Sequence, residues 1–409
     1  MKKVNLCRVC SGKLKLIYRF GKISLIGNFS KSKKKQKKYN ISLNYCDDCF
    51  HIQIAEIIDP KEIFKNYLWE TGISKTNLSL IDDLIKKLGK YKISKNSNVL
   101  EVASNDGTLV NRFFKKTKCK IVGIDPAKNL SKLNYIKSTI RLTNFFNFET
   151  ALKMKRKYSY FDFIIARNVI AHIENPNEIF KGVETLLKEQ GIFVLEVPHL
   201  YNIFKYNQYD NIFHEHIGFH SLKSILDLAN LNNLKVINAE TVDSQGGSIR
   251  CYISRLNSNH RINISKIKKI LKMEINQGLM NKKKIMNFKK RITNHKFQLL
   301  KLIKKLKEKK QKISAYGASG KGLALYQFSQ LNNSKLIDFI FDKSYLKIGK
   351  YAPGSKIKVC NPKTIARDKI DYLLLLTWNL KKEILKQEKK FLKLGGKFIL
   401  PFPLPKIIK

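Results

Sequence analysis

The stretch NIFHEHIGFHS (residues 211–221) concentrates side chains that can do chemistry. It holds three of the eight histidines within seven positions, His214, His216 and His220, with Glu215 between the first two. A histidine of ordinary pKa can transfer a proton or bind a metal at neutral pH. The run lacks the H-E-x-x-H spacing that places two metal ligands on one helical face, which disfavours a metal. Proton transfer and core packing remain open, and core packing is favoured for His214 and His220 taken singly.

Two C-x-x-C pairs near the start of the sequence have the spacing of a zinc site. Four thiolates can occupy the corners of a tetrahedron, and such a closed site is structural because no position stays open for a substrate. The four ligands are Cys7, Cys10, Cys46 and Cys49. A redox pair is the alternative. The lysine-rich loop 31–38 between the pairs is expected to be solvated and mobile. Three further cysteines are scattered, and the odd total favours a reducing compartment over a disulfide framework.

The turn EVASNDG (residues 101–107) lies between an apolar strand and a helical stretch. It departs from the dinucleotide-binding fingerprint, because Ala103 and Asn105 stand where glycines are expected and only Gly107 remains. By itself the turn is a weak signal, and an ordinary strand–helix turn is the alternative.

A carboxylate at the end of the next strand strengthens the signal from this turn. Asp125 follows Glu101 by 24 positions, close to the spacing at which an acidic residue accepts the hydroxyls of a ribose. A phosphate would require bare glycines and an open helix N-terminus. The acidic Glu101 and Asp106 instead suit a cofactor that carries a positive charge and no phosphates. S-adenosylmethionine is such a molecule.

The composition is strongly basic, with 80 Lys and Arg against 31 Asp and Glu and a formal charge of +49 in 409 residues. The excess is almost all lysine and is spread along the whole chain together with Asn and Ile. This favours compositional bias and solvated faces over a nucleic-acid surface, so nucleic acid is disfavoured as a partner. No apolar run is long enough to span a bilayer, and no signal peptide is evident. We therefore expect a cytoplasmic protein with a small-molecule substrate and no membrane.

Apolar runs and helical patterns alternate along most of the chain, which is typical of an α/β fold with parallel sheets. We expect a zinc-binding lobe with its linker (1–75), a doubly wound domain (76–255) and a second Rossmann-like domain (256–409). Helices are predicted at 78–88 and after Asn175, a plausible N-cap that Pro176 follows. A basic amphipathic helical stretch, roughly 264–310, opens the third segment, and we assign it no chemistry.

The sequence resembles the nucleotide-sugar C-methyltransferases almost from end to end. The resemblance is carried by LEVASNDGTL, GIDPA, NVIAH, FHEHIGFHSL, QGGSIR, YGASGKG, FDKSYLKIGKYAPG, LLTWNLKKEI and GGKFILPFP, in this order after the cysteine pairs. It implies a zinc-binding lobe, an S-adenosylmethionine domain and a Rossmann-like domain, with a nucleoside-diphosphate keto-sugar bound between the last two.

This resemblance also implies catalytic residues. His216 is the expected base, which removes the proton beside the sugar ketone. Glu215 is expected to orient an imidazole or contact the substrate, His172 to bond to the enolate or the sugar, and Tyr67 to lie near the reacting centre. The family commonly has tyrosine where this chain has Phe213, so another substrate or transfer to oxygen stays open.

Further residues are expected to bind the two ligands. The cofactor residues are Glu101, Ala103, Asn105, Gly107, Asp125, Phe145, Phe146 and Asn168, with the two phenylalanines flanking the adenine. The substrate residues are Arg250, by resemblance, and Gly317, Ser319 and Lys321, in a turn that can offer N–H groups and an ammonium to a diphosphate.

The leading hypothesis is an S-adenosylmethionine-dependent C-methyltransferase that acts on a nucleoside-diphosphate keto-deoxysugar. O- or N-methylation of a sugar nucleotide is the first alternative, and a nucleic-acid methyltransferase or a non-catalytic binding protein are the others. The sequence leaves the oligomeric state open.

Overall fold

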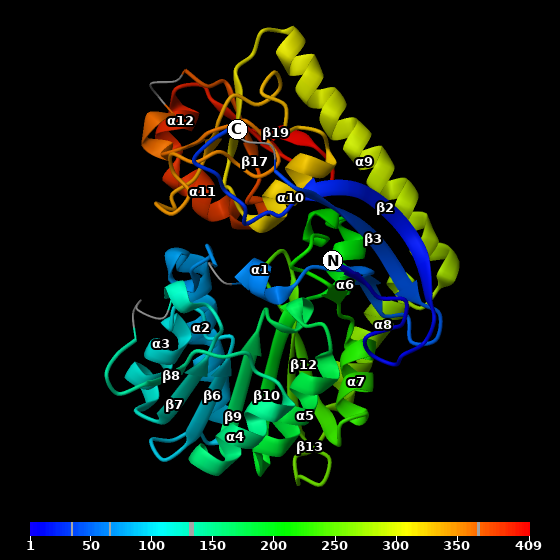
Figure 1. Cartoon of the computed structure of the whole chain (residues 1–409), viewed down its shortest axis with the longest axis vertical. Helices are drawn as coiled ribbons and strands as arrows, with labels where there is room; N and C mark the ends of the chain where they lie inside the picture. The colour runs from blue at the N-terminus through cyan, green and yellow to red at the C-terminus, as the bar shows by residue number, and fades with distance from the viewer. Residues whose placement is uncertain (34–35, 65–66, 131–134, 366–368) are drawn as a thin grey trace.

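The computed structural model describes residues 1–33, 36–64, 67–130, 135–365 and 369–409. The predicted lysine-rich loop therefore lies partly outside the described residues. Two α/β bodies lie along the long axis of the molecule, and a curved hairpin and a long helix run along one side (Figure 1). The predicted class, two Rossmann-like sheets with a cysteine-rich lobe at the N-terminus, is confirmed.

The N-terminal lobe is built on a long antiparallel hairpin that is completed by a strand from far along the chain. Its four-stranded sheet has the order β11-β4-β3-β2, and a separate two-stranded sheet joins β1 to β5. The strands are β1 (Lys2–Lys3), β2 (Leu14–Ser24), β3 (Lys38–Cys46), β4 (Ile52–Ile54), β5 (Glu56–Ile57) and β11 (Gly218–Phe219). A short helix, α1 (Pro60–Phe64), follows. Because β11 belongs to the histidine run, this sheet ties the run to the lobe.

The middle body is a seven-stranded sheet in the order β12-β13-β10-β9-β6-β7-β8. Strands β6 to β10 are parallel and strongly apolar, as expected for strands that helices cover on both faces, while β12 and β13 add an antiparallel edge. The strands are β6 (Asn98–Val102), β7 (Lys120–Ile124), β8 (Ile140–Leu142), β9 (Phe161–Arg167), β10 (Leu187–Pro198), β12 (Leu234–Val242) and β13 (Ser248–Arg255). The helices are α2 (Lys75–Leu88), α3 (Thr108–Thr117), α4 (Phe148–Tyr158), α5 (Pro176–Leu186), α6 (Leu200–Lys205) and α7 (Leu222–Asn230).

Two of these helices were predicted, and α5 begins as its sequence indicates. Asn175 is its N-cap, with a side chain that accepts a hydrogen bond from the N–H of Asn177 at 3.2 Å, and Pro176 occupies the first turn. The basic stretch at 264–310 is helical, as expected, and forms two helices. Helix α8 (Ile264–Gln277) ends at Gly278, which adopts φ of +86°, and α9 (Lys282–Glu308) follows. Glycine adopts this left-handed conformation without the steric cost of a side chain.

The C-terminal body is a six-stranded sheet in the order β16-β15-β14-β17-β18-β19, parallel except for its last strand. The strands are β14 (Ile313–Tyr316), β15 (Ile340–Phe341), β16 (Val359–Cys360), β17 (Tyr372–Leu375), β18 (Lys397–Leu400) and β19 (Lys406–Ile408). Helices α10 (Gly320–Phe328), α11 (Lys381–Gln387) and α12 (Lys389–Lys393) accompany it.

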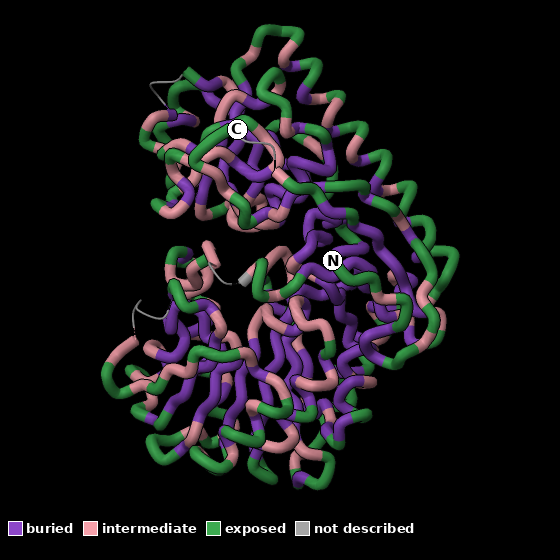
Figure 2. Tube along the Cα trace, in the orientation of Figure 1, coloured by how far each residue is buried: buried purple, intermediate pink, exposed green. Residues whose placement is uncertain are grey.

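The buried residues follow the strands of both sheets, and exposed residues lie at the turns and along the outer face of α9 (Figure 2). Among its described residues, the buried apolar side chains of the lobe do not form a separate cluster. Apolar side chains of its hairpin, including Ile17, Phe20 and Leu43, belong to one cluster with residues of α9, α10 and β14. This shared core fixes the hairpin and the C-terminal body against each other.

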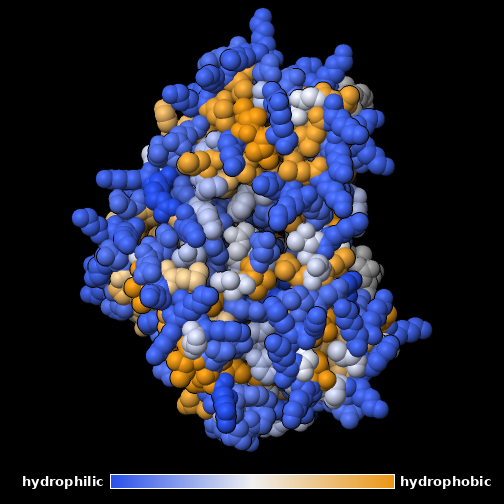
Figure 3. Space-filling view, turned by 180° about the vertical axis from the view of Figure 1, so that it is seen from behind, coloured by the Kyte–Doolittle hydropathy of each residue, from blue (hydrophilic) through white to orange (hydrophobic). Residues whose placement is uncertain are grey.

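Hydrophilic side chains are spread from end to end over the face shown in Figure 3, with apolar patches between them. Among the described residues, no helix is both long enough and apolar enough to cross a membrane.

Candidate active site

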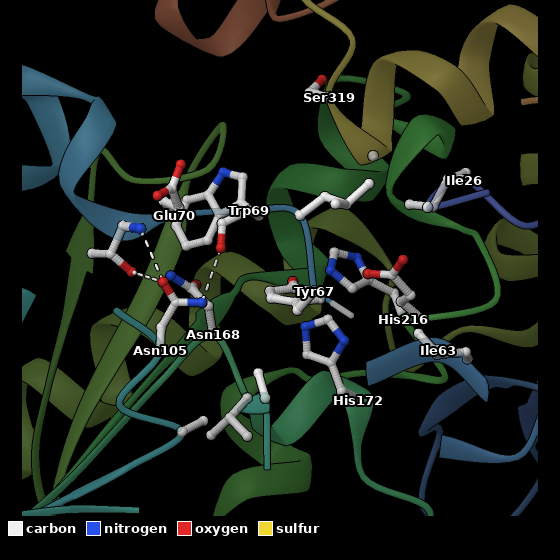
Figure 4. A pocket seen from close by; sticks show the side chains of 18 of the residues that line it. Ile26, Ile63, Tyr67, Trp69, Glu70, Asn105, Asn168, His172, His216 and Ser319 are labelled. Carbon is white, nitrogen blue, oxygen red and sulfur yellow. Dashed lines mark hydrogen bonds between the residues drawn. The ribbon is translucent and has the colours of Figure 1, made fainter. Parts of the chain in front are cut away.

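A cavity of about 1240 Å³ lies between the two α/β bodies and is bordered by the N-terminal lobe (Figure 4). All the predicted catalytic and ligand-binding residues line it except Gly107 and Arg250. Its size suits two ligands, because pockets for a single small molecule are commonly of about 300–1,000 Å³.

The floor of one half is the turn after β6, which Asp125 holds in shape. The Asp125 carboxylate accepts hydrogen bonds from the N–H of Asn105 at 2.9 Å and of Ala127 at 2.8 Å. Ala103 and Asn105 both have positive φ, 59° and 51°, so this strained turn is kept by its partners rather than by glycines. Gly107 lies beneath it, where a Cβ would stand 2.5 Å from the Tyr135 ring. Gly107, a predicted cofactor residue, is not among the residues that line the cavity, and its lack of a side chain serves the close packing below the turn.

Glu101 gives this half of the cavity its chemical character. It is 6% exposed, it lines the cavity, and its Oε2 has no hydrogen-bond partner among the described residues. Burial raises the pKa of its carboxyl well above the ordinary value, and the nearby carboxylates of Asp106 and Asp125 add to this, while Arg167 opposes it. An unpaired buried carboxylate is unfavourable until a donor or a cation reaches it. The residues present therefore fit a cofactor with a cationic amino acid part and a ribose.

A segment just before α2 lies over this turn, and sequence reasoning missed it. The side-chain amide of Asn105 donates to the carbonyl of Trp69 at 3.0 Å, and its oxygen accepts from the N–H of Thr71 at 3.0 Å (Figure 4). Asp106 accepts from the N–H of Gly72 at 2.9 Å. The side chain of Asn105 thus holds the covering segment, and only the tertiary contact reveals this use.

Three further predicted cofactor residues border the same half. Phe145 and Phe146 line the cavity, and Phe146 is buried against Gly182 of α5, where an added Cβ would lie 3.1 Å from its ring. Asn168 follows β9 with φ of 54°, and its Oδ1 has no hydrogen-bond partner in the described part of the chain. An aromatic pair and an open amide oxygen fit a purine base with its amino group.

At the centre of the cavity His216 and His172 bring their imidazoles together. The ring centroids lie 4.8 Å apart with the planes at 76°. The backbone explains this proximity, because the N–H of Ile217 donates to the carbonyl of Ala171 at 2.7 Å, and each of these residues is the chain neighbour of one histidine. The carbonyl of Ile217 in turn accepts from the N–H of Ile54 in the N-terminal lobe at 3.1 Å.

The contacts of His216 select one tautomer. Its Nδ1 lies 3.0 Å from the carbonyl oxygen of Asn211, an acceptor, so Nδ1 carries the hydrogen and Nε2 keeps its lone pair. Burial lowers the pKa of His216 well below its ordinary value, and the nearby His172 and Lys321 lower it further. The ring of Phe213 lies 4.2 Å away, centroid to centroid, and adds an apolar wall. His216 is therefore a neutral imidazole at neutral pH, with a basic nitrogen available.

The neighbouring predicted residues share this environment. Burial raises the pKa of the Glu215 carboxyl to about 7 and that of the Tyr67 phenol well above its ordinary value. Burial also lowers the pKa of His172 to about 4. Tyr67 lines the same cavity as both imidazoles (Figure 4). The site thus holds a neutral phenol and two neutral imidazoles at neutral pH.

The other two histidines of the run, His214 and His220, contact residues of the N-terminal lobe. The Nε2 of His214 lies 3.3 Å from the carbonyl oxygen of Asn40 in β3, and its residue also borders the cavity. His220 is 1% exposed, and its ring lies 4.9 Å from that of His51 in the lobe. Both therefore contribute to packing between the lobe and the middle body.

The C-terminal body supplies the other half of the cavity through the turn between β14 and α10. Gly317 adopts φ of +90°, where a Cβ would collide with Thr377. Ser319 caps α10, and its hydroxyl accepts from the N–H of Gly322 at 3.2 Å. Lys321 is 6% exposed, and burial lowers its pKa to about 8 although Asp210 opposes this. A cation therefore lines this half of the cavity.

Arg250 is elsewhere, and its prediction is corrected. It lies on β13 at 0% exposure and does not line the cavity. Its Nε donates to Glu196 at 2.9 Å and its Nη1 to Glu240 at 3.1 Å. The QGGSIR motif turns before its arginine enters the sheet, so the guanidinium neutralises the buried Glu196 and the half-buried Glu240 of the middle body.

The four cysteines of the C-x-x-C pairs form a metal site. Their Sγ atoms lie within 4.8 Å of one another, with Cys7 to Cys49 at 3.6 Å and Cys10 to Cys46 at 3.5 Å. Four thiolates at such distances suit tetrahedral zinc and leave no position for a substrate, so the zinc is structural.

Comparisons with known proteins agree with this layout. Residues 7–64 match a family described as a putative zinc binding domain, residues 74–239 a methyltransferase domain, and residues 243–403 a C-methyltransferase C-terminal domain. The chain is similar to the C-methyltransferase NovU of Streptomyces niveus, with 29% identity over 416 residues that cover 100% of this chain and 98% of that protein.

Solved structures align with parts of the chain at low similarity. A magnesium protoporphyrin IX methyltransferase from Synechocystis, solved with S-adenosylmethionine, is 12% identical, covers 44% of this chain and 79% of its own, and has a TM-score of 0.33. A putative methyltransferase complex of Haloferax volcanii with the activator Trm112 is 9% identical, covers 44% of this chain and 94% of the other, and has a TM-score of 0.35. From the three matched domains in their order and the end-to-end similarity to NovU, the chain is an S-adenosylmethionine-dependent methyltransferase, and it is similar to C-methyltransferases along its whole length.

Proposed function

We propose that this enzyme methylates a carbon next to the ketone of a nucleoside-diphosphate keto-deoxysugar, with His216 as the base. The observation that carries the proposal is the His216 imidazole itself. Its Nδ1–H is held by the Asn211 carbonyl, its Nε2 lone pair is left for chemistry, and it lines a cavity with an S-adenosylmethionine turn on one side and a lysine on the other.

The bound S-adenosylmethionine supplies an electrophilic methyl group on its sulfonium. The work of the chain is to make a nucleophilic carbon. Nε2 of His216 takes a proton from the carbon beside the ketone, and the electrons of that C–H bond move into an enolate. An enolate oxygen needs donors in a site that excludes water, and the phenol of Tyr67 and the imidazole of His172 are the neighbouring groups that can provide them.

In the half of the cavity formed by the middle body, we assign residues to the parts of S-adenosylmethionine that their charge and hydrogen-bonding groups fit. Glu101 would pair with the amino group of the methionine part, Asp125 would accept the ribose hydroxyls, and Phe145 and Phe146 would flank the adenine. The unpartnered Oε2 of Glu101 supports the first assignment, since an ammonium would relieve its burial. Asp125 retains lone pairs for two hydroxyls after it has accepted two backbone N–H groups.

Methyl transfer to an oxygen is the second candidate reaction, and Phe213 favours it. Its phenyl ring packs on the base where relatives by resemblance have a phenol, so one donor for a ketone oxygen is missing. A sugar hydroxyl could be deprotonated by the same Nε2 without that donor.

A single experiment separates these reactions. The purified enzyme is incubated with methyl-¹³C-labelled S-adenosylmethionine and a panel of nucleoside-diphosphate 4-keto and 3-keto sugars, and products are followed by carbon-13 NMR. We expect a methyl signal bonded to carbon. A methyl signal bonded to oxygen would support the second reaction, and no labelled product from any keto sugar would refute both.

A further inference from the structure

An arginine inside the first C-x-x-C turn contacts the segment that carries His216. Arg8 lies between the first two cysteines of the zinc site and is 8% exposed. Its Nη1 donates to the carbonyl of Ile217, the residue directly after His216, at 2.8 Å, and to the carbonyl of Ile54 on β4 at 2.8 Å. Arg8 is not among the residues that line the cavity. Any effect of this side chain on the reaction therefore passes through the backbone beside His216.

The backbone of the same turn is fixed to both sides of this segment. The N–H of Arg8 donates to Oε1 of Gln53 at 2.9 Å, and Gln53 pairs with Gly218 where β4 meets β11. From the middle body, the side-chain amide of Asn177 in the first turn of α5 donates to the carbonyl of Arg8 at 3.2 Å. The turn of the zinc site thus connects β4, β11 and α5 at the place where His216 enters the cavity.

The zinc site accounts for the charge of Arg8. The Nε and Nη2 atoms are buried and have no hydrogen-bond partner among the described residues, and the nearby carboxylate of Glu174 is paired with Lys2 at 2.7 Å. A buried cation is unfavourable without a counter-charge. Four thiolates on one Zn²⁺ leave a net negative charge, and two of these thiolates, Cys7 and Cys10, flank Arg8 in the sequence. Bound zinc would therefore stabilise the guanidinium in this place.

The contact with Arg8 completes the fixation of the residue next to His216. The N–H of Ile217 donates to the carbonyl of Ala171 at 2.7 Å, and its carbonyl accepts from the N–H of Ile54 at 3.1 Å as well as from Arg8. Both polar groups of this residue are thus bonded to other parts of the chain. A displacement of about 1 Å at a reacting group can lower a rate about a hundredfold, so this fixation matters for a base.

We propose that Arg8 is a positioning residue for catalysis, which connects the zinc site to the backbone of Ile217 and thereby holds the His216 imidazole in its place in the cavity. This inference rests on the proposed function, because that function makes His216 the base. It gives the zinc-binding lobe a part in the reaction in addition to its part in the fold.

The first test compares Arg8→Met and Arg8→Lys with the parent in the full chain. Methionine removes both hydrogen bonds, so we expect kcat to fall about tenfold to a hundredfold, with KM and S-adenosylhomocysteine binding within about threefold of the parent. Lysine keeps the charge on a shorter side chain, so kcat should fall less, about threefold to tenfold. Arg19→Met, which changes an exposed arginine on β2 of the same lobe, is the matched control and should behave as the parent does. Zinc content by atomic absorption should equal that of the parent in each variant, which shows that the site has formed.

A double-mutant cycle with His216→Ala separates positioning from a general loosening of the fold. If Arg8 acts through His216, Arg8→Met should change the residual rate of His216→Ala by less than about twofold. An equal factor in both backgrounds would overturn the inference, as would a kcat of Arg8→Met within about twofold of the parent. If Arg8→Met loses its zinc, Arg8→Lys decides instead, and a parent-like kcat in that variant overturns the inference.

A second test needs no substrate. In protein labelled with ¹⁵N-histidine, the ring signals of His216 are assigned by their absence in His216→Ala, and the parent should show the Nδ1–H tautomer. We expect a mixture of tautomers in Arg8→Met and the parent spectrum in Arg19→Met. Identical His216 signals in Arg8→Met and the parent would overturn the inference. Failure of the proposed function would look different: the tautomer would still depend on Arg8, but His216→Ala would methylate as the parent does.

Discussion

Replacement of His216 by alanine is the most direct test of the chemistry. The variant removes the only atom that the mechanism uses as a base and leaves the Asn211 carbonyl that oriented it. Because burial and the neighbouring His172 and Lys321 lower the pKa of His216 well below its ordinary value, nearly every parent molecule holds the base form at neutral pH. The whole contribution of general-base catalysis is therefore lost, about 10² to 10⁴ in kcat, or roughly 3 to 5 kcal/mol of activation free energy.

Two assays measure this loss of catalytic rate. Single-turnover methylation measures the rate itself, and deuterium exchange into the keto sugar in heavy water, with S-adenosylhomocysteine present, measures proton removal alone. Both should fall together in His216→Ala, while S-adenosylhomocysteine binds as in the parent. The control is His260→Ala, whose imidazole contacts the Gln190 carbonyl away from the cavity. If His216→Ala exchanges and methylates within threefold of the parent, the base is another group.

The pH profile gives the same argument a second measurement. The base is active when it is deprotonated, so a lowered pKa keeps it active to lower pH. We expect kcat/KM to stay level on the acid side until below about pH 6.5, the ordinary histidine value. Glu215 is the neighbouring group that titrates at higher pH than His216, because burial raises the pKa of its carboxyl to about 7. A limb near pH 7 that disappears in Glu215→Gln belongs to this carboxyl, whereas one that persists contradicts the low pKa of His216.

Three further outcomes are expected. Replacing Cys46 by serine, or removing zinc with a chelator, should lower the unfolding temperature and release one zinc per chain by atomic absorption; a chain without bound zinc would contradict the site. Glu101→Gln should weaken S-adenosylmethionine binding by calorimetry about tenfold or more, because it removes the charge beside the cationic ligand, and unchanged affinity would refute the role of this carboxylate. Glu196→Gln should lower the free energy of unfolding by about 3–5 kcal/mol, since it leaves the buried guanidiniums of Arg167 and Arg250 short of a counter-charge. Denaturant unfolding measures this, and a change under 1 kcal/mol would show that Glu240 suffices.

Local sequence signals were enough to predict the zinc ligands and the start of α5. The cysteine pairs place four thiolates by short turns, and Asn175 with Pro176 starts α5, because caps and knuckles depend on residues a few positions apart. The Glu101 turn with Asp125 is also local to one strand–helix–strand unit. The alternation of apolar runs with helical patterns likewise determined two parallel sheets.

Contacts between distant segments decided the rest. By resemblance, the arginine of QGGSIR was predicted to contact the substrate in the cleft. The strand register instead places Arg250 opposite Glu196 inside the sheet. The covering segment at Trp69 to Gly72 is held by side chains more than 30 positions away, and no spacing rule reports it.

By itself the sequence determined the two Rossmann-like sheets, the thiolate set and the acidic turn after β6, since hydrophobic periodicity and short motifs act through neighbours along the chain. Only the tertiary structure decided that two imidazoles 44 positions apart share one cavity. Their meeting depends on the Ile217 to Ala171 hydrogen bond and on the pairing of β11 with β4, contacts that form only when three parts of the chain pack together.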